Sequence, residues 1–313
     1  MMTDKKISAV IACYLDEPAI SLMYERLTRT FTQVTPNYEM VFVNDGSPDN
    51  SEAILTALAG RDPRVVVITH TRNFSSQNAF LSGMHVATGD AVVLLDGDLQ
   101  DPPELIPQLV ERWLAGYEVV YGVRVKREAS LFLRAAYKLF YRILQKLAYV
   151  RIPLDAGDFS LLDRRVVETL KDLGERDIFL RGLRAWIGFR QTGVPYVRPA
   201  RMFGRTTNSL IKNVRWARKA IFAFSFAPLE WVSYVAGLVT ILAAIGIVVY
   251  IVLAIFYPAP RGFLTLLVVS LFLGSVQLLA LSVIGEYVAK IFEEVKGRPH
   301  YIVRSILNDP RGK

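Results

Sequence analysis

Apolar and polar positions follow two alternating patterns over the first 122 residues. Four short runs are rich in aliphatic residues and end at polar turns, as strands buried on both faces of a sheet do. Segments with a helical spacing of apolar residues separate them. The strand-like runs are ISAVIACY, EMVFVND, VVVIT and AVVLLD, and the helical segments are residues 18–32, 51–60, 76–88 and 104–115. This order predicts an α/β fold with a mostly parallel, Rossmann-like sheet, in which ligands bind beyond the carboxyl ends of the strands.

Two longer apolar stretches occupy the last third of the chain. Trp231 to Phe256 and Phe263 to Gly285 contain no Asp, Glu, Lys, Arg or His. At about 1.5 Å of rise per helical residue, each is longer than the roughly 30 Å hydrocarbon core of a bilayer. We therefore expect two transmembrane helices that tilt or extend into the interface.

The net charge of +8 is concentrated beside these apolar stretches. Six Lys and Arg residues lie between positions 201 and 219 and six between 290 and 313, whereas the connecting loop YPAPRG contains only Arg261. By the positive-inside rule, the large N-terminal region and the C-terminal end face the cytoplasm. Basic flanks attract anionic lipid head groups, so this charge predicts a membrane partner and not nucleic acid.

These patterns divide the chain into a domain, a membrane hairpin and a tail. Residues 130–149 carry basic groups every four positions, which favours either an interfacial helix or a domain helix with a solvated basic face. The N-terminus lacks an apolar core before a small-residue cleavage site, so we expect no cleaved signal peptide. The expected boundaries are 1–209 for the domain, 210–230 for an amphipathic juxtamembrane helix, 231–256 and 263–285 for the spans, 257–262 for a short outer loop and 286–313 for a basic cytoplasmic tail.

Carboxylates crowd the end of the fourth apolar run. Asp96 and Asp98 follow it on a turn, and Gln100 adds an amide oxygen. Hard divalent cations such as Mg²⁺ and Mn²⁺ prefer oxygen ligands and commonly link one or two carboxylates to substrate phosphates. The stretch therefore predicts a metal site. Asp101 and Glu104, in the sequence DPPE, instead have the spacing of a helix start.

The cysteine and histidine residues give no second metal site. The single cysteine, Cys13, is expected to be a small core residue on a strand. His70, His85 and His300 are too scattered along the chain to suggest a cluster, and we expect them on the surface or on helix faces. Cation binding is therefore left to carboxylate and amide oxygens.

Several ordered motifs together resemble the bacterial polyisoprenyl-phosphate glycosyltransferases, relatives of dolichol-phosphate mannose synthase. They are VFVNDGSPDNS, TRNFSSQNAFLSGMHVATGDAVVLLDGDLQDPPE, VVYGVR, DAGDFSLLDRRVV, LRGLRAWIGFRQTGVPYVRPAR and IGEYVAKIFEEVKGRPHYIV. The resemblance covers nearly the whole chain. It implies an A-type glycosyltransferase fold and inverting transfer of a sugar from a nucleotide donor to a lipid phosphate, usually undecaprenyl phosphate. It also implies a bacterial inner-membrane protein and a homotetramer.

The resemblance assigns roles to the residues at the strand ends. The acidic turn matches the metal and diphosphate site of the family. Tyr14, Asp16 and Asp45 match its nucleoside-binding positions. We add Gly97, because a residue without a side chain lets a substrate approach the backbone closely. UDP-glucose is the common donor in the family; mannose, galactose, N-acetylglucosamine and a modified arabinose stay open.

Asp158, in AGDFS, matches the position often proposed as the catalytic base. A phosphate monoester has a second pKa of about 6 and is already largely ionised at pH 7, so it needs little deprotonation. We therefore expect Asp158 to orient the acceptor or the metal, with base catalysis secondary, and Asp155 is a weaker candidate for the same role. Two anions held near one metal also require cationic side chains. The candidates for phosphate binding are Arg124, Arg134, Arg201 and Arg205.

Two other functions are compatible with parts of the sequence. Ala12, Leu15 and Thr207 stand where relatives commonly carry Pro, Asn and Lys, which favours a membrane-anchored scaffold or flipping partner with a degenerate transferase domain. The intact acidic turn and Asp158 oppose that interpretation. A processive polysaccharide synthase would need more spans and a Q-x-x-R-W motif, which the chain lacks.

Overall fold

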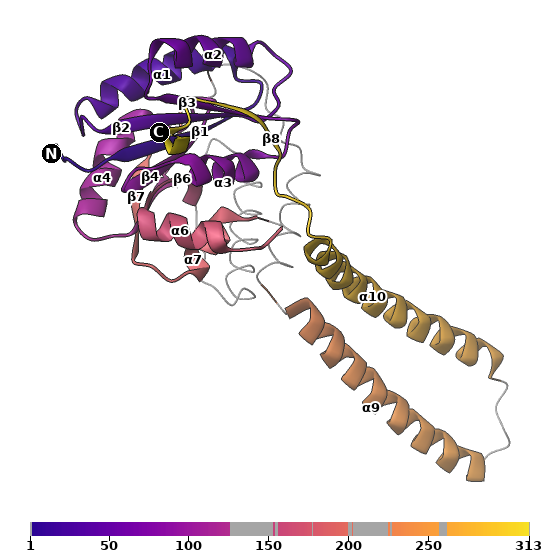
Figure 1. The fold of residues 1–313 in the computed structure, drawn as a ribbon. Coiled ribbons are helices and arrows are strands. Elements are labelled where there is room, and N and C mark those ends of the chain that lie inside the picture. The colour runs from indigo at the N-terminus through magenta and orange to yellow at the C-terminus, as the bar shows by residue number, and fades with distance from the viewer. Residues whose placement is uncertain are drawn as a thin grey trace. The chain divides into compact units, whose positions relative to one another are not determined.

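The computed structural model describes residues 2–125, 153, 156–176, 178–199, 202, 225, 227–256 and 262–312. These residues belong to two compact units. The first contains the described residues up to 202 together with those from 298 onwards, and the second contains those from 225 to 297. Figure 1 shows the α/β layers of the first unit and the two long helices of the second.

In the described part of the chain, eight strands form one sheet in the order β7-β5-β6-β4-β1-β2-β3-β8. The four N-terminal strands are parallel, as predicted, whereas β6 runs antiparallel to β4 and β5, and β8 antiparallel to β3. The strands are β1 (Ile7–Cys13), β2 (Tyr38–Asn44), β3 (Val65–His70), β4 (Ala91–Asp96), β5 (Val119–Arg124), β6 (Ala156–Asp163), β7 (Gln191–Tyr196) and β8 (Val303–Leu307).

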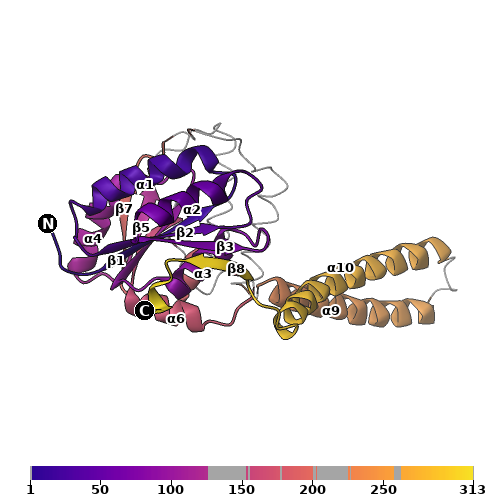
Figure 2. The same ribbon diagram turned by 45° about the horizontal axis from the view of Figure 1, so that its top comes forward.

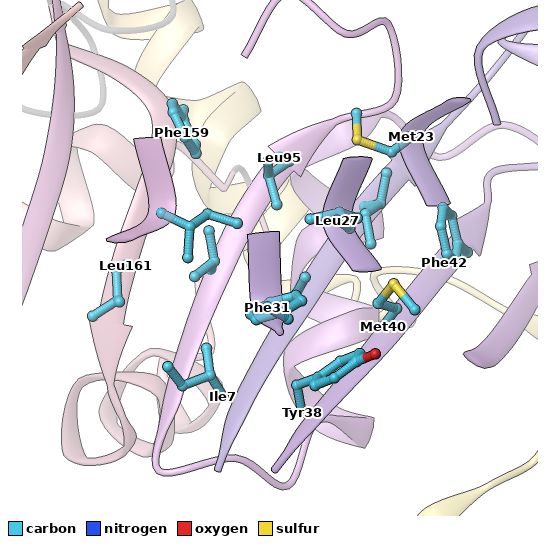
Figure 3. Close-up of a cluster of buried hydrophobic side chains, with 14 of the residues drawn as sticks. Ile7, Met23, Leu27, Phe31, Tyr38, Met40, Phe42, Leu95, Phe159 and Leu161 are labelled. Carbon is cyan, nitrogen blue, oxygen red and sulfur yellow. The ribbon is translucent and has the colours of Figure 1, made fainter. Parts of the chain in front are cut away.

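Helices cover both faces of the sheet. Figure 2 shows α1 and α2 on one side, and α3 and α6 on the other. The face under α1 and α2 holds a large apolar cluster, in which Met23, Leu27 and Phe31 of α1 lie on Ile7, Phe42 and Leu95 of the strands (Figure 3). The helices are α1 (Glu17–Phe31), α2 (Ser51–Arg61), α3 (Ser76–Val86), the 3-10 helix η1 (Pro103–Leu105), α4 (Ile106–Leu114), α6 (Arg164–Asp172) and α7 (Leu180–Trp186).

The C-terminal end is a part of the sheet and not only a basic tail. Strand β8 pairs with the edge strand β3, so that Ile306 lies opposite Ile68. Asn308 fixes the end of this strand, because its side-chain amide donates hydrogen bonds to the carbonyls of Ala59 (2.8 Å) and Val65 (2.9 Å). The pairing covers backbone groups of β3 that would otherwise be exposed at the edge.

The second unit is a pair of long helices, α9 (Ala227–Phe256) and α10 (Phe263–Val295). Both contain stretches long and apolar enough to cross a membrane, with mean hydropathies of 2.7 and 1.7, and neither stretch is buried within the structure. Helix α10 continues ten residues beyond the expected end at Gly285, because charged side chains end an apolar run but not a helix. Most of the expected juxtamembrane helix, the connecting loop and residues 130–149 lie outside the described residues.

Candidate active site

The strand register brings the predicted site residues to one edge of the sheet. Cys13 of β1 lies beside Asn44 of β2, and Ala12 lies beside Asp96 of β4, so these three strands end level with one another. Strand β6 runs in the opposite direction, and its first residues therefore reach the same edge. The loops after β1, β2 and β4 and the start of β6 carry the predicted nucleoside, metal and catalytic positions.

A buried leucine, Leu99, holds the acidic turn after β4 in a strained backbone conformation. Leu99 has a φ of 61°, in the left-handed region that side chains other than Gly, Asn and Asp rarely adopt. Its side chain is only 1% exposed and belongs to the main apolar cluster. The Gln100 amide N–H donates to Asp98 Oδ1 at 3.0 Å. Burial of Leu99 thus fixes the turn that presents the carboxylates.

Gly97 lies close against the end of β1. Its N–H donates to the Ala12 carbonyl at 2.9 Å. A Cβ at this position would lie 3.0 Å from the Ala12 carbonyl oxygen, 3.0 Å from Asp16 Oδ2 and 3.1 Å from Cys13 Sγ. The close approach that requires glycine is therefore made by the end of β1. Nucleotide contact at Gly97 stays a prediction.

The carboxylates at this edge lie close enough to affect one another's ionisation. Burial, together with the charges of Asp101, Asp98 and Asp158, raises the pKa of Asp96 well above its usual value. A nearby cation would relieve this repulsion. The described residues contain no group of three or more His, Cys, Asp or Glu side chains arranged for a metal. Two carboxylates with substrate phosphates and water are instead the usual surroundings of Mg²⁺, and the donor set fits such a cation.

Gln100 can complete this donor set. Its Nε2 donates to the Pro199 carbonyl at 3.3 Å, which orients the amide so that Oε1 is the acceptor left for a ligand. The contact joins the acidic turn to the segment that follows β7.

The helical segment predicted after DPPE begins at Pro103 with Glu104 in its first turn, but Asp101 does not cap it. The 3-10 helix that begins at Pro103 has no side-chain cap. Asp101 is 1% exposed, accepts a hydrogen bond from the Tyr196 hydroxyl at 2.7 Å, and lies 3.9 Å from Arg198 Nε. Glu104 pairs with Arg26 of α1. These partners are distant in sequence, so the local spacing of DPPE could not reveal them.

Arg124, at the end of β5, is the predicted phosphate-binding arginine that the structure describes. Its Nε donates to the Tyr196 hydroxyl at 3.3 Å, and Tyr196 in turn donates to Asp101. A Cβ at Gly157 would lie 2.9 Å from Arg124 Nη2, so the guanidinium lies against the start of β6. Arg124 therefore contacts the residue that precedes Asp158. The other candidates, Arg134, Arg201, Arg205 and Asp155, lie outside the described residues.

Two arginines of α7, which the sequence interpretation missed, hold Asp158. Arg181 Nε lies 3.3 Å from Asp158 Oδ1 as an ion pair. Arg184 is 2% exposed and donates to the carbonyls of Gly157 (2.8 Å) and Asp158 (3.3 Å). Burial lowers the pKa of Arg184 to about 10, so it stays cationic at neutral pH. The three-residue spacing in LRGLR, which places both side chains on one helix face, was the available signal.

The predicted nucleoside positions follow β1 and β2. Tyr14 is 38% exposed, and its N–H donates to Asp16 Oδ2 at 3.0 Å. Asp45 Oδ1 accepts hydrogen bonds from the Phe74 N–H (2.9 Å) and lies 2.8 Å from His70 Nδ1. Our expectation for His70 was wrong, because the side chain is 1% exposed at the end of β3 and not on the surface or on a helix face.

A Rossmann-like sheet with two carboxylates on the turn after its fourth strand is the arrangement of an A-type glycosyltransferase domain. Residues 8–171 match the model of the family named Glycosyl transferase family 2. The chain belongs to this family and is a glycosyltransferase.

Similarity to curated relatives extends over nearly the whole chain. It is 42% identical to the glycosyltransferase YkcC of Bacillus subtilis, over 95% of this chain and 93% of the relative. It is 40% identical to the SfII prophage-derived bactoprenol glucosyl transferase of Shigella flexneri, over 96% of this chain and 97% of the relative. It is 38% identical to the prophage bactoprenol glucosyl transferase homolog of Escherichia coli K12, over 96% of this chain and 99% of the relative.

Proposed function

We propose that this chain transfers glucose from UDP-glucose to undecaprenyl phosphate, with inversion, on the cytoplasmic leaflet of a bacterial inner membrane. One observation carries the proposal: an acidic turn and the Asp158–Arg181 ion pair share a sheet edge in a chain that also contains two exposed, span-length apolar helices. The names of two relatives, bactoprenol glucosyl transferases, support this acceptor and this sugar.

A divalent cation is part of the proposal. Asp96, Asp98 and Gln100 would hold Mg²⁺ or Mn²⁺, which would offset the negative charge of the donor's diphosphate as it leaves. Tyr14, which is exposed, and the carboxylates after β1 and β2 would bind the nucleoside. Burial and three neighbouring carboxylates raise the pKa of Asp96, and a cation bound here would favour its ionised form.

The acceptor's phosphate would lie on the other side of the sugar, near Arg124 and Asp158. A phosphate oxygen attacks the anomeric carbon as the bond from that carbon to the diphosphate breaks, which inverts the configuration. Since the phosphate is already ionised, Asp158 would orient it through its pairing with Arg181. Confinement of the lipid to the membrane plane beside the site would contribute through proximity.

The C-terminal strand supports the proposed topology. Strands from both sides of the apolar helix pair belong to one sheet. A sheet with unpaired edges does not extend through a bilayer, which supports a topology with both ends of the helix pair on one side of the membrane. Two crossings satisfy this condition, and the basic flanks favour the cytoplasm as that side.

Transfer of radiolabelled sugar tests the proposal directly. We expect the full-length protein in nanodiscs to label undecaprenyl phosphate from UDP-glucose with Mn²⁺ or Mg²⁺, and to lose this activity with EDTA. The pair of substitutions Asp96→Asn and Asp98→Asn should abolish transfer, whereas Glu111→Gln on the exposed face of α4 should not change it. Transfer from another nucleotide sugar would change only the donor named in the proposal. No transfer from UDP-glucose, GDP-mannose or UDP-N-acetylglucosamine would favour the non-catalytic scaffold.

A further inference from the structure

His70 is a buried polar residue that neither the core nor the proposed chemistry explains. Its Nδ1 lies 2.8 Å from Asp45 Oδ1 and its Nε2 lies 2.9 Å from Ser82 Oγ on α3. An ionised carboxylate only accepts hydrogen bonds, so Nδ1 is the donor to Asp45. Both ring nitrogens are thus satisfied, and the imidazole joins the end of β2 to α3.

The hydrogen bonds of Asp45 use only one of its two carboxylate oxygens. Oδ1 receives both the His70 Nδ1–H and the Phe74 N–H. Within the described residues, Oδ2 has no hydrogen-bond donor, and the Asp45 side chain as a whole is 3% exposed. Two donors on Oδ1 fix the rotation of the carboxylate, and this leaves Oδ2 as a pre-oriented acceptor at the ligand edge of the sheet.

The C-terminal segment closes over His70. The Tyr301 ring stacks on the imidazole, with centroids 5.2 Å apart and an interplanar angle of 12°. The Thr71 N–H donates to the Ile302 carbonyl at 3.0 Å, just before β8 begins. This cover keeps water from the hydrogen bond between His70 and Asp45, and a hydrogen bond to a charged group is stronger in such surroundings.

We propose that His70 is a positioning residue for the donor: it holds Asp45 so that Oδ2 accepts an N–H from the nucleobase. The inference rests on the proposed function. For a uracil nucleotide the donating group is N3–H, the imide proton between the two carbonyls. The part of the chain that follows the apolar helices would then contribute to donor recognition through Tyr301.

Two substitutions at His70 separate positioning from packing. Asparagine places an amide nitrogen near the position of Nδ1 and can still donate to Asp45, whereas glutamine reaches the position of Nε2 and cannot. UDP binding is measured calorimetrically on the full-length protein with Mn²⁺. We expect His70→Gln to weaken binding about tenfold, the order for one lost hydrogen bond to a charged group, and His70→Asn to weaken it less than about threefold. Thr56→Val, which removes only a hydrogen bond to the Glu52 carbonyl within the exposed helix α2, is the control.

Kinetics and a donor analogue complete the test. In His70→Gln the KM for the donor should rise about tenfold while kcat changes less than about threefold, since Asp45 does not touch the reacting atoms. UDP methylated at N3 should bind wild type about tenfold more weakly than UDP, and His70→Gln should lose most of this discrimination. Equal losses in both His70 variants, with lowered melting temperatures, would instead make His70 a packing residue and overturn the inference. If the wild type binds no uridine nucleotide, the proposed donor itself is wrong.

Discussion

Removal of the Tyr196 hydroxyl tests the buried contact that holds the acidic turn. In Tyr196→Phe, Asp101 loses a 2.7 Å hydrogen bond, and Arg198 Nε, at 3.9 Å, is too far away to replace it. A hydrogen bond to an ionised group contributes about 1.5–3 kcal/mol, and one to a neutral group about 0.5–1.5 kcal/mol. The effect of the substitution should therefore depend on whether Asp101 is ionised.

The direction of this pH dependence follows from the pKa of Asp101. Burial raises this pKa above its unfolded value, although Arg198, Arg124 and the Tyr196 hydrogen bond partly oppose the rise. Stability from such a group is fully present below the unfolded pKa and is lost as pH rises through the folded pKa. Without the Tyr196 hydroxyl the folded pKa is higher still, so the variant loses more stability. The difference between wild type and Tyr196→Phe should therefore grow as pH rises.

Thermal unfolding of the full-length protein in detergent, with EDTA to remove cations, measures this difference. A change of 1 kcal/mol shifts the melting temperature of a 150–250-residue domain by about 2–4 °C. We expect Tyr196→Phe to melt about 4–8 °C below wild type at pH 8 and about 2–4 °C below it at pH 4.5. Tyr117→Phe, whose hydroxyl has no hydrogen-bond partner within the described chain, is the control. A difference that is constant with pH would refute the reasoning.

Three further substitutions address the site. Leu15 has a φ of 58°, in the left-handed region that asparagine tolerates better than leucine, so Leu15→Asn should raise the melting temperature by about 2–4 °C. No rise would mean that the backbone at Leu15 is unstrained. Gly97→Ala should displace the acidic turn, because the added Cβ would meet the Ala12 carbonyl. The Mn²⁺ concentration for half-maximal activity should then rise at least about tenfold, and an unchanged concentration would contradict this. Asp158→Asn should raise the KM for the lipid acceptor, measured by initial rates, without shifting the pH profile of kcat. Loss of turnover together with a shifted profile would instead identify Asp158 as a base.

The parallel half of the sheet could be predicted because its information is local. Each strand there is one apolar run, and parallel strands end at a common edge, so Asp45, Asp96 and Asp98 were expected together from spacing alone. The sites missed depend on pairings between distant segments. Asp101 is held by a tyrosine 95 positions away, and His70 is covered by Tyr301, more than 200 positions away. No periodicity in a single window contains such contacts.

The C-terminal strand was missed for a different reason. Residues 303–307, VRSIL, include Arg304 and lie at a sheet edge with three exposed positions, so their alternation is weak. A basic segment after an apolar helix is typical of a lipid-binding tail. The interpretation of this segment therefore followed its positive charge and not the weak alternation of its apolar residues. Edge strands often carry charged side chains, which limit pairing with other molecules. The same basic residues therefore fit both a cytoplasmic tail and an edge strand, and the sequence pattern could not distinguish the two.

The charges around Asp158 indicate where the rate of the proposed reaction would come from. Asp158 is paired with Arg181, and a phosphate acceptor that is already largely ionised at neutral pH needs little help from a base. The difficulty of the reaction is instead to hold a lipid phosphate and a nucleotide diphosphate side by side. Arg124 and Arg181 at one end of the site, and a cation at the acidic turn, would offset that repulsion in a fixed arrangement. In the proposed reaction, these groups would therefore act by binding and positioning two anions and not by proton transfer.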